Sequence, residues 1–397
     1  MSEDGMRILI VTHVVARNDG QGRVNYEIAR AALAAGHCVT LLASRVAPDL
    51  LDDPRVRFVQ IAVSRLPTRL LQHQIFAWRS GLWIRANRNE FDVVHVNGFI
   101  SWARADVNAV HFVHDGWYRC GFYPFAFFRS LYEAYQVAYT RLNAHCEKWA
   151  FQHSEVIVPV SEKVAGEVRS LGIDRARLQV IHNGVDVDEF APGASERARF
   201  GLPDAPFLLL FAGDLRVSRK NLDTVLRALA MTPRHVHLVV AGILRNSPYP
   251  ATVAALGLAD RVHFTDLVKD MPALMRSVDA FVFPSRYEAM SLVLLEALAA
   301  ALPVITAKTS GGAEVIGSDC GVVLDNPDDV LGLADAIERV AGDRVQARRM
   351  GKAARALART LGWDTMAQRY LSLYEGICMR RGVQRDAVAQ VELSAES

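Results

Sequence analysis

The sequence has few cysteines, almost no net charge and no long apolar run, and each absence excludes a class of protein. Its 397 residues include an odd number of cysteines and no Cys-x-x-Cys pair, so neither a disulfide framework nor a zinc site is expected. A formal net charge of +2 gives no support to a nucleic-acid partner. No stretch reaches the roughly 18 consecutive apolar residues that a membrane-spanning helix needs. The five cysteines are Cys38, Cys120, Cys146, Cys320 and Cys378.

What the chain does contain is a regular alternation of strand-like and helix-like segments. With 51% hydrophobic and 22% charged residues, the composition is typical of a well-packed soluble enzyme, and the cysteine usage fits a reducing cytoplasm. The length favours two domains over one core. Alternating strands and helices indicate an α/β fold with parallel sheets, so we predict two doubly wound, Rossmann-like domains that face each other across a cleft.

The strands predicted in the first domain cover residues 7–12, 38–42, 56–61, 92–96, 109–113, 156–160 and 178–181. A second series covers residues 206–213, 236–241, 262–264, 280–283 and 303–307. We place the first domain at residues 1–196, a polar link at 197–205 and the second domain at 206–360. Residues 361–381 are predicted to form a helix that packs back on the first domain, and residues 382–397 a disordered tail.

Two glutamates, Glu288 and Glu296, are the most informative residues. The apolar strand 280–283 ends at Pro284, and Ser291 is predicted to cap the helix that follows. Glu288 then lies in the loop and Glu296 inside a largely apolar helix, where an unpaired carboxylate is costly. Because a helix start also attracts anions, the pair suits a ligand with both hydroxyls and phosphates. The alternative is a solvated loop residue and half of a surface ion pair.

Other candidates also follow predicted strands. Gly20 and Gly22 precede a helix over 24–35 and leave room for a ligand, or form only a flexible loop; a nicotinamide-type glycine motif would need a third glycine at Asn25. His114 ends another strand and is either a hydrogen-bond partner for a substrate hydroxyl or a structural histidine. The remaining candidates are Gly213, Arg216, Arg219 and Lys220 before a helix over 222–231, and the paired Gly311 and Gly312.

No metal or other cofactor is predicted. Asp186 and Asp188 form an Asp-x-Asp pair of the kind that some sugar-transfer enzymes use for a metal. They lie in a turn that leaves the first domain, so we interpret them as turn and cap residues. No other set of His, Cys or carboxylate residues has convincing ligand spacing.

Taken together, these motifs resemble the retaining glycosyltransferases of family 4, also called group 1, which have the GT-B fold. The resemblance covers about residues 7–374 and depends on Glu288 and Glu296 eight positions apart, with further matches at Leu302-Pro303-Val304, Gly311-Gly312-Ala313-Glu314, His182-Asn183-Gly184-Val185-Asp186 and Arg219-Lys220-Asn221. It implies a nucleotide-diphosphate sugar as donor and an acceptor hydroxyl on a glycan, glycolipid or small glycoside.

The resemblance also assigns roles. Glu296 would bind the ribose, Glu288 and His114 the transferred sugar, with His111 as the other candidate histidine, and Lys220 the diphosphate. The amides of Met290, Ser291 and Leu292 would meet phosphate or sugar oxygens, and Gly20 and Gly22 would let the first domain close over the phosphates. Asp214 stands where the family often has arginine, so Arg216 or Arg219 would supply that charge.

Two other classes of function remain open on the same fold. One is a nucleotide-sugar epimerase or hydrolase, and the other is a non-catalytic protein that binds sugar nucleotides. The acceptor side adds a further alternative. Residues 61–153 hold ten Arg or Lys against six Asp or Glu, with many aromatics. This region either docks peripherally on the inner face of an anionic membrane or packs a long helix against the sheet.

Overall fold

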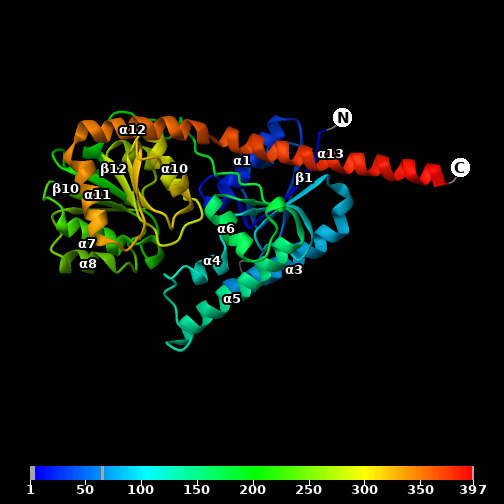
Figure 1. Ribbon diagram of the computed structural model, residues 1–397, viewed down its shortest axis with the longest axis horizontal. Coiled ribbons are helices and arrows are strands. Elements are labelled where there is room, and N and C mark those ends of the chain that lie inside the picture. Colours follow the sequence, from blue (N-terminus) through cyan, green and yellow to red (C-terminus); the bar gives the residue numbers. More distant parts are fainter. Residues whose placement is uncertain (1–4, 64–66, 396–397) are drawn as a thin grey trace.

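The computed structural model describes residues 5–63 and 67–395, except for the side chains of 383–395. In this part of the chain, two six-stranded parallel sheets form two domains side by side (Figure 1). The first sheet has the order β5-β3-β1-β6-β7-β8 and the second β11-β10-β9-β12-β13-β14. Both orders are the doubly wound arrangement that places ligands at the carboxyl ends of the strands, as predicted.

The strands of the first sheet are β1 (Arg7–Val11), β3 (Cys38–Ala43), β5 (Val56–Gln60), β6 (Val93–Asn97), β7 (Ala105–Val110) and β8 (Ser154–Pro159). Those of the second are β9 (Phe207–Ala212), β10 (Val236–Ala241), β11 (Val262–Asp266), β12 (Ala280–Phe283), β13 (Val304–Ala307) and β14 (Gly321–Leu324). Two short strands, β2 (Val14–Val15) and β4 (Arg45–Val46), pair separately.

Helices cover both sheets. The first domain has α1 (Gly20–Ala34), α2 (Pro48–Leu51), α3 (Arg69–Asn87), α4 (His114–Arg119), α5 (Leu131–Gln152) and α6 (Glu162–Ser170). The second has α7 (Leu222–Met231), α8 (Tyr249–Ala255), α9 (Met271–Arg276), α10 (Leu292–Ala299), α11 (Val330–Gly342) and α12 (Arg344–Ala358), followed by α13 (Trp363–Ala395). Short 3-10 turns lie at Arg88–Glu90, Arg175–Arg177, Arg197–Phe200, Ser218–Lys220, Gly311–Val315 and Arg359–Leu361.

Most predicted strands are confirmed within one or two residues, and the exceptions have physical causes. The strand predicted at 109–113 is β7, which begins earlier at Ala105, because Asp106 is buried with partners: it accepts from the amide of Val94 at 2.7 Å and pairs with Arg88 at 2.8 Å. The strand predicted at 178–181 is wrong, since only a single bridge from Leu178 to Ile157 forms there. Strand β14 was not predicted, because its four residues are too short for a pattern.

The segment predicted to link the domains instead packs against the second one. Arg197 donates to a carboxylate oxygen of Asp279 at 2.7 Å and to the carbonyl of Ser277 at 3.0 Å. The chain crosses between the domains earlier, near Val185, and returns at Gly362. These two residues form a bridge, so the two crossings lie together.

Helix α13 runs from the second domain across the first, where it packs against α1 (Figure 1). Its buried Met366, Tyr370 and Tyr374 join the core of the first domain, and the Tyr374 hydroxyl lies 2.5 Å from Nδ1 of His95. Helix α13 continues to Ala395, within the tail that was predicted to be disordered from residue 382, and residues 396–397 of that tail lie outside the described residues. This segment lacks proline and contains several good helix formers.

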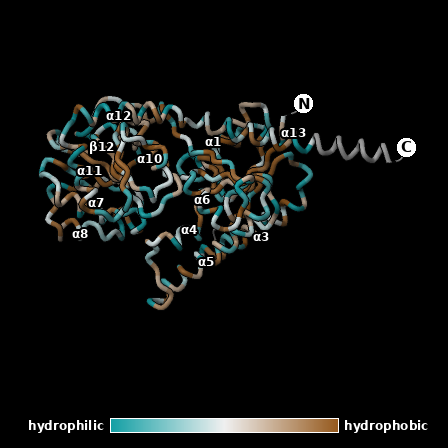
Figure 2. The backbone as a smooth tube through the Cα atoms, in the orientation of Figure 1, coloured by the Kyte–Doolittle hydropathy of each residue, from teal (hydrophilic) through white to brown (hydrophobic). Residues whose placement is uncertain are grey.

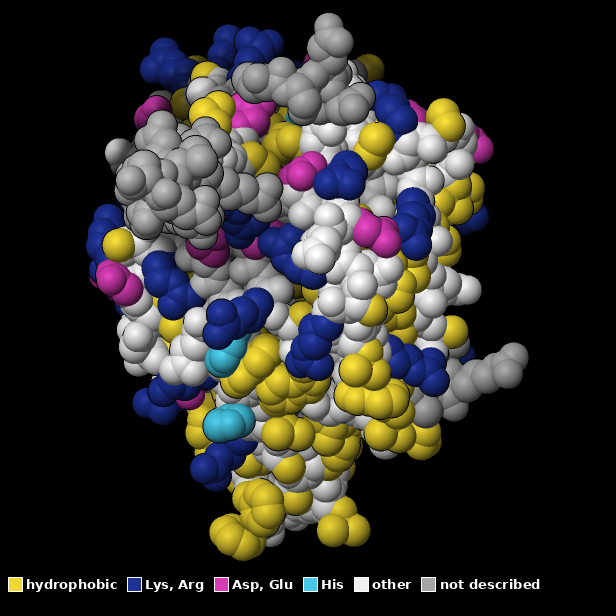
Figure 3. Space-filling model, turned by 90° about the vertical axis from the view of Figure 1, so that its right-hand side faces the viewer, with side chains coloured by type: hydrophobic (Ala, Val, Ile, Leu, Met, Phe, Trp, Pro, Cys, Tyr) yellow, Lys and Arg dark blue, Asp and Glu magenta, His cyan; other side chains and the backbone are white. Residues whose placement is uncertain are grey.

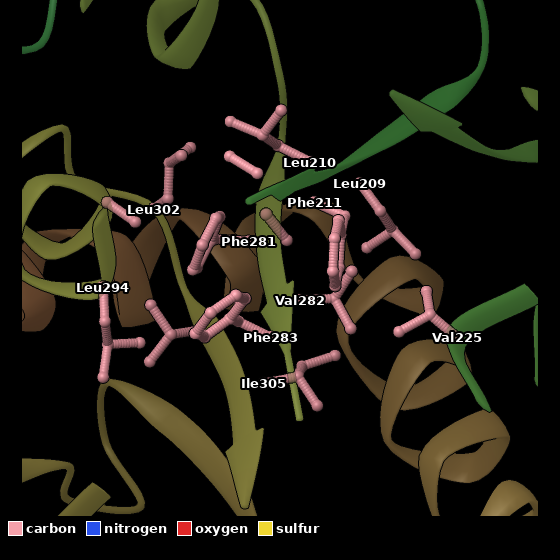
Figure 4. Packing of buried hydrophobic residues seen from close by; sticks show 14 of the residues in the cluster. Leu209, Leu210, Phe211, Val225, Phe281, Val282, Phe283, Leu294, Leu302 and Ile305 are labelled. Carbon is pink, nitrogen blue, oxygen red and sulfur yellow. The ribbon is translucent and has the colours of Figure 1, made fainter. Parts of the chain in front are cut away.

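Hydrophobic residues concentrate on the central sheets of both domains (Figure 2). In the second domain, Phe281 and Phe283 stack with ring centroids 5.8 Å apart on the side of the sheet that faces Leu294 of α10, and the Phe211 ring lies tilted at 46° to that of Phe283 (Figure 4). This buried layer carries the carboxyl ends of β9 and β12, from which the candidate site projects. None of the helices in the described ranges has the length and apolar character needed to cross a bilayer.

Candidate functional site

Glu288, Lys220 and Arg219 form a charged cluster where β9 and β12 end. The Lys220 ammonium donates to Oε2 of Glu288, and Nη1 of Arg219 lies 3.5 Å from the same oxygen. Burial would raise the pKa of Glu288, but the charges of Lys220 and then Arg219 outweigh it and hold the pKa below its ordinary value. The site therefore holds one ionised carboxylate against two cations.

The two loops that carry this cluster are tied to each other. The backbone carbonyl of Arg219 accepts from the amide of Arg286 at 2.9 Å and from Oγ of Ser285 at 3.0 Å. Arg219 in turn donates to the carbonyl of Tyr287 at 2.9 Å. Asn221, fully buried with a positive φ of 68°, donates to the carbonyl of Pro284 at 2.9 Å. These bonds fix the spacing between Lys220 and Glu288.

Arg216 is not part of the cluster. Its guanidinium makes a bidentate ion pair with Asp214: Nε donates to Oδ1 and Nη2 to Oδ2, each at 2.8 Å. The hydrogen bonds from Arg216 lower the pKa of Asp214, which keeps the pair ionised. Of the two arginines proposed to replace the family's usual one, Arg219 is therefore the one near Glu288. Gly213 lies beside Lys220, whose Cγ would be 3.5 Å from an added Cβ.

Glu296 lines a separate small cavity of about 90 Å³ between the domains. Burial, and then the like charge of Glu189, raise its pKa to about 7, while Arg23 acts in the opposite direction. Arg23, on α1, lies 3.6 Å from Glu189. Asp186 also lines this cavity and accepts from the amides of Asp188 and Glu189 at 3.1 and 2.9 Å, which confirms its predicted turn role.

The two glycines of the first loop, Gly20 and Gly22, differ in whether the structure leaves room for a side chain. Oδ1 of Asp19 accepts from the amide of Gly22 at 2.7 Å and caps α1, which therefore begins at Gly20 rather than at the predicted Val24. A Cβ on Gly22 would lie 2.8 Å from Oδ1 of Asp19 and 3.0 Å from the carbonyl of Val14. A Cβ on Gly20 would meet nothing within 4 Å.

Gly311 and Gly312 are needed for close packing. The amide of Gly311 donates to the carbonyl of Glu288 at 2.9 Å, and a Cβ there would overlap the carbonyl of Ala289. A Cβ on Gly312 would lie 2.7 Å from Leu294. Ser291 precedes α10 as predicted, but its side chain makes no capping bond, so the predicted cap is wrong. Its hydroxyl therefore leaves the first amides of α10, beginning at Leu292, uncapped.

His114 begins α4 at the carboxyl end of the first sheet. Its Nδ1 lies 2.7 Å from Oε1 of buried Glu147, and its amide donates to Oε2 at 2.8 Å. Phe112 packs edge-on against His114 and against Tyr287, and Arg219 lies over the Phe112 ring. This aromatic contact brings His114 close to the Glu288 cluster.

His111, the other candidate histidine, is unsuited to the role. Its Nε2 is buried and has no hydrogen-bond partner in the described part of the chain, and burial lowers its pKa to about 4.

The first domain also holds the Glu288 loop directly, through residues to which the sequence analysis assigned no role. The Tyr287 hydroxyl lies 2.9 Å from the carbonyl of Val113 and 2.8 Å from a carboxylate oxygen of Glu167. Nδ2 of Asn183 donates to the carbonyl of Met290 at 3.0 Å, and Oγ of Ser161 to that of Ala289 at 2.9 Å. Asn183 belongs to one of the motifs of the family resemblance, whereas the others had no sequence signal beyond their proximity to the predicted loops. Over the described ranges, no group of three His, Cys, Asp or Glu side chains is placed to hold a metal ion.

Two family models match the chain and together span most of it. Residues 18–189 match the family described as Glycosyltransferase Family 4, and residues 194–357 match Glycosyl transferases group 1. The chain belongs to glycosyltransferase family 4. This confirms the resemblance drawn from Glu288, Glu296 and the accompanying motifs, and it establishes glycosyl transfer as the general activity.

Among curated members of this family, a D-inositol 3-phosphate glycosyltransferase of Xylanimonas cellulosilytica is 29% identical over 378 residues, which cover 86% of this chain and 87% of the relative. A glycogen synthase of Mycobacterium tuberculosis is 32% identical over 248 residues, which cover 59% of this chain and 57% of that protein.

Solved structures of glycosyltransferases share the GT-B fold of this family-4 chain. A sucrose-phosphate synthase from Thermosynechococcus elongatus matches with a TM-score of 0.77 at 22% identity, over 94% of this chain and 99% of that one. WaaG, a glycosyltransferase involved in lipopolysaccharide biosynthesis, matches at 0.74 and 20% identity, over 93% and 100%. Anabaena HepE in complex with UDP-glucose matches at 0.69 and 17% identity, over 94% and 100%.

Proposed function

We propose that this chain moves a hexosyl unit from a nucleotide-diphosphate sugar to an acceptor hydroxyl, with retention of the anomeric configuration and without a metal ion. The observation that carries the proposal is the pair of cations, Lys220 and Arg219, held beside ionised Glu288 at the carboxyl ends of β9 and β12. HepE, a structural neighbour, was crystallised with UDP and with UDP-glucose, which supports a donor of this class.

In the proposed reaction, the bond from the anomeric carbon to the diphosphate oxygen breaks while a bond to the acceptor oxygen forms on the same face. The bonding electrons leave with the diphosphate, and the acceptor proton passes to its departing oxygen. Lys220 and Arg219 stabilise the charge that develops there, since fixed cations need no reorganisation during the step. Two such cations, together with the uncapped amides of α10, supply the stabilisation that a metal provides elsewhere.

Glu288 is assigned to the donor sugar rather than to nucleophilic attack. Its carboxylate is already the counterion of Lys220, and a lowered pKa makes it a poorer nucleophile. As an ionised group it only accepts hydrogen bonds, which suits the hydroxyls of a hexose. We assign it to hold the sugar beside the cations that receive the leaving diphosphate.

His114 is assigned to a sugar hydroxyl from the side of the first domain. Glu147 accepts at Nδ1, so the proton of a neutral ring lies there and Nε2 is left as an acceptor. A carboxylate behind a histidine also fixes the orientation of the ring. Glu296, in its own cavity beside Arg23, is assigned to the ribose hydroxyls of the nucleotide.

A panel of nucleotide-diphosphate sugars tests the donor by thermal stabilisation of the full chain. We expect one base and sugar to raise the melting temperature, and the rise to persist in excess chelator. If none of the panel stabilises the protein, donor binding is refuted; if the rise disappears with chelator, metal independence is refuted.

Product analysis with the donor found in this way separates the three classes of function. A transferase releases nucleoside diphosphate only with an acceptor, and proton NMR shows the donor's anomeric configuration in the new glycoside. An epimerase or hydrolase turns over the donor alone. A binding protein gives no product with any acceptor, and Glu288→Gln then changes affinity without changing any rate.

A further inference from the structure

A projecting tip of the first domain presents large apolar side chains to solvent. It comprises residues 125–132, which join α4 to the start of α5 (Figure 1). Phe128 is 97% exposed and Leu131 is 93% exposed, with Tyr132 and Phe127 also more than half exposed. Such a cluster has an energetic cost in water and marks an interaction site when it is contiguous.

Hydrogen bonds and ring packing within the tip fix the conformation in which its apolar side chains are exposed. Oγ of Ser130 accepts from the amide of Glu133 at 3.2 Å and caps α5. The Glu133 carboxylate accepts a hydrogen bond from the amide of Ala126 at 2.8 Å. This bond closes the turn and gives the carboxylate a partner within the tip. Phe127 and Phe128 pack edge-on against each other with ring centroids 5.2 Å apart. The turn therefore holds the apolar side chains outward.

Helices α3 and α5 continue from the tip as one face with a single sign of charge. They lie together, since the Tyr139 hydroxyl is 3.2 Å from Nδ1 of His73. Helix α3 contains no Asp or Glu. Of the two acids of α5, Glu133 is held by the amide of Ala126 and by Arg129 at 3.6 Å, and buried Glu147 faces His114. The exposed cations of this face form no ion pair in the described part of the chain; they are Arg69, Arg79, Arg85, Arg141 and Lys148.

Exposed apolar residues lie among these cations. They are Leu71, Trp78 and Leu82 on α3 and Leu142 on α5. Seen from this side, hydrophobic side chains fill the lower part of the molecule down to the tip, with Lys and Arg around them and most acidic side chains above (Figure 3). The sequence alternative in which all these aromatics pack against the sheet is therefore wrong for Trp78, Phe127 and Phe128, although Trp117 is buried.

We propose that this face docks on an anionic lipid bilayer, with Phe127, Phe128, Leu131 and Tyr132 inserted among the headgroups. Apolar side chains with flanking Arg and Lys match the two layers of such a surface, the acyl boundary and the negatively charged headgroups. A second copy of the chain is a poorer occupant, because two faces with the same uncompensated positive charge repel each other. Each cation near the surface strengthens binding about fivefold.

Docking in this orientation has a consequence that rests on the proposed function. Helix α5 leads from Leu131 at the membrane to Glu147, the partner of His114, a rise of about 24 Å along the helix. An acceptor glycan of a few sugars on a lipid headgroup spans that distance. We therefore infer a lipid-linked acceptor, whose sugar end reaches the cleft while its lipid stays in the bilayer.

Vesicle flotation with the full chain tests the surface without depending on catalysis. We expect binding to phosphatidylcholine vesicles that contain phosphatidylglycerol, little binding to phosphatidylcholine alone, and loss of binding as salt is raised. The double variant Phe128→Ser with Leu131→Ser removes the most exposed apolar side chains and is expected to bind at least tenfold more weakly. Arg141→Gln, which removes the unpaired cation of α5 nearest to the tip, is expected to bind up to about fivefold more weakly.

A matched control uses exposed leucines of the second domain, Leu267→Ser with Leu331→Ser, which are 71% and 63% exposed. This control is expected to float like the unchanged chain. The proposal is overturned if the unchanged chain fails to bind anionic vesicles at low salt, if tip and control variants lose binding equally, or if the tip variant converts a dimer into a monomer without affecting flotation. Nucleotide-sugar stabilisation of the same variants separates this outcome from failure of the proposed function, because donor binding does not involve the tip.

Discussion

The hydroxyl of Tyr287 lies 2.9 Å from the backbone carbonyl of Val113, so one hydrogen bond joins the residues directly before Glu288 and before His114. Tyr287 is fully buried and belongs to the second domain, while Val113 belongs to the first. The two halves of the candidate site are thus coupled through their neighbours rather than by contact with each other. Lys163, whose ammonium lies 3.9 Å from the Tyr287 ring centroid, adds a charge to the same junction.

Replacing Tyr287 with phenylalanine tests this coupling. The ring keeps its packing, but Val113 and Glu167 lose a buried partner, so we expect a loss of about 1–3 kcal/mol in the free energy of unfolding. Transfer is expected to slow through kcat, with donor affinity little changed, because the hydroxyl touches neither the cation cluster nor the Glu296 cavity. Denaturant melts and steady-state kinetics measure both. Tyr118→Phe is the matched control on an exposed tyrosine, and equal effects in the two variants would contradict the coupling.

Lys220→Ala is expected to lower kcat by about 10²–10³-fold, the usual cost of removing one charge-stabilising donor from a transition state. Folding is expected to persist, because Arg219 still faces Glu288. Arg219→Ala is expected to lower kcat less than Lys220→Ala but more than Arg216→Ala. The effect of Arg216→Ala is expected to be small, because the Arg216 guanidinium is paired with Asp214 rather than with Glu288. Donor-saturated rates give the comparison, with Arg234→Ala on an exposed surface pair as the control. A rate for Lys220→Ala near that of the unchanged chain would remove Lys220 from the mechanism.

Glu296 predicts a pH dependence of both stability and donor binding. Burial raises its pKa from the ordinary 4.5 to about 7, so the folded chain holds more protons than the unfolded chain between these values. Stability from this group is therefore present at low pH and is lost as pH rises towards about 7, by at most about 3 kcal/mol. Glu296→Gln is expected to remove this loss, so the variant gains stability relative to the unchanged chain above pH 7.

Donor binding is expected to show the opposite trend, because only the ionised carboxylate accepts hydrogen bonds from both ribose hydroxyls. Affinity for the nucleotide-sugar should rise from about pH 6 to about pH 8 in the unchanged chain and stay level in Glu296→Gln. Calorimetric titration across this range measures the effect. Parallel pH profiles in the two proteins would show that Glu296 does not bind the donor.

Gly311→Ala tests whether the Glu288 loop must pack closely on the first domain. The new Cβ would overlap the carbonyl of Ala289 and Oγ of Ser161, so the loop has to move. We expect a loss of more than about 3 kcal/mol in stability and a large loss of activity. Gly342→Ala, where an added Cβ meets nothing within 4 Å, is the matched control and is expected to be neutral. Normal activity in Gly311→Ala would show that the observed approach is not needed for function.

Local sequence patterns were sufficient to predict the limits of a helix or strand where the environment of the segment is uniform along its length. Strand β12, at Ala280–Phe283, and helix α7, at Leu222–Met231, were predicted with their observed limits because each is a continuous buried or amphipathic run. The prediction failed where a polar residue is buried with a distant partner. Asp106, near the start of β7, fell outside the strand predicted at 109–113, yet it pairs with Arg88 and with Arg381, 275 positions along the chain.

The amino-acid sequence alone determined the two-domain α/β fold, the family, and the loops at the strand ends that carry Glu288, Lys220 and His114. These features follow from short-range periodicity and from residues close together in the chain. Only the tertiary structure decided that Arg219 rather than Arg216 faces Glu288, that Tyr287 connects the two domains, and that Phe128 projects into solvent. Each of these depends on which side chain a folded neighbour pairs with or leaves uncovered, and sequence spacing carries no information about such partners.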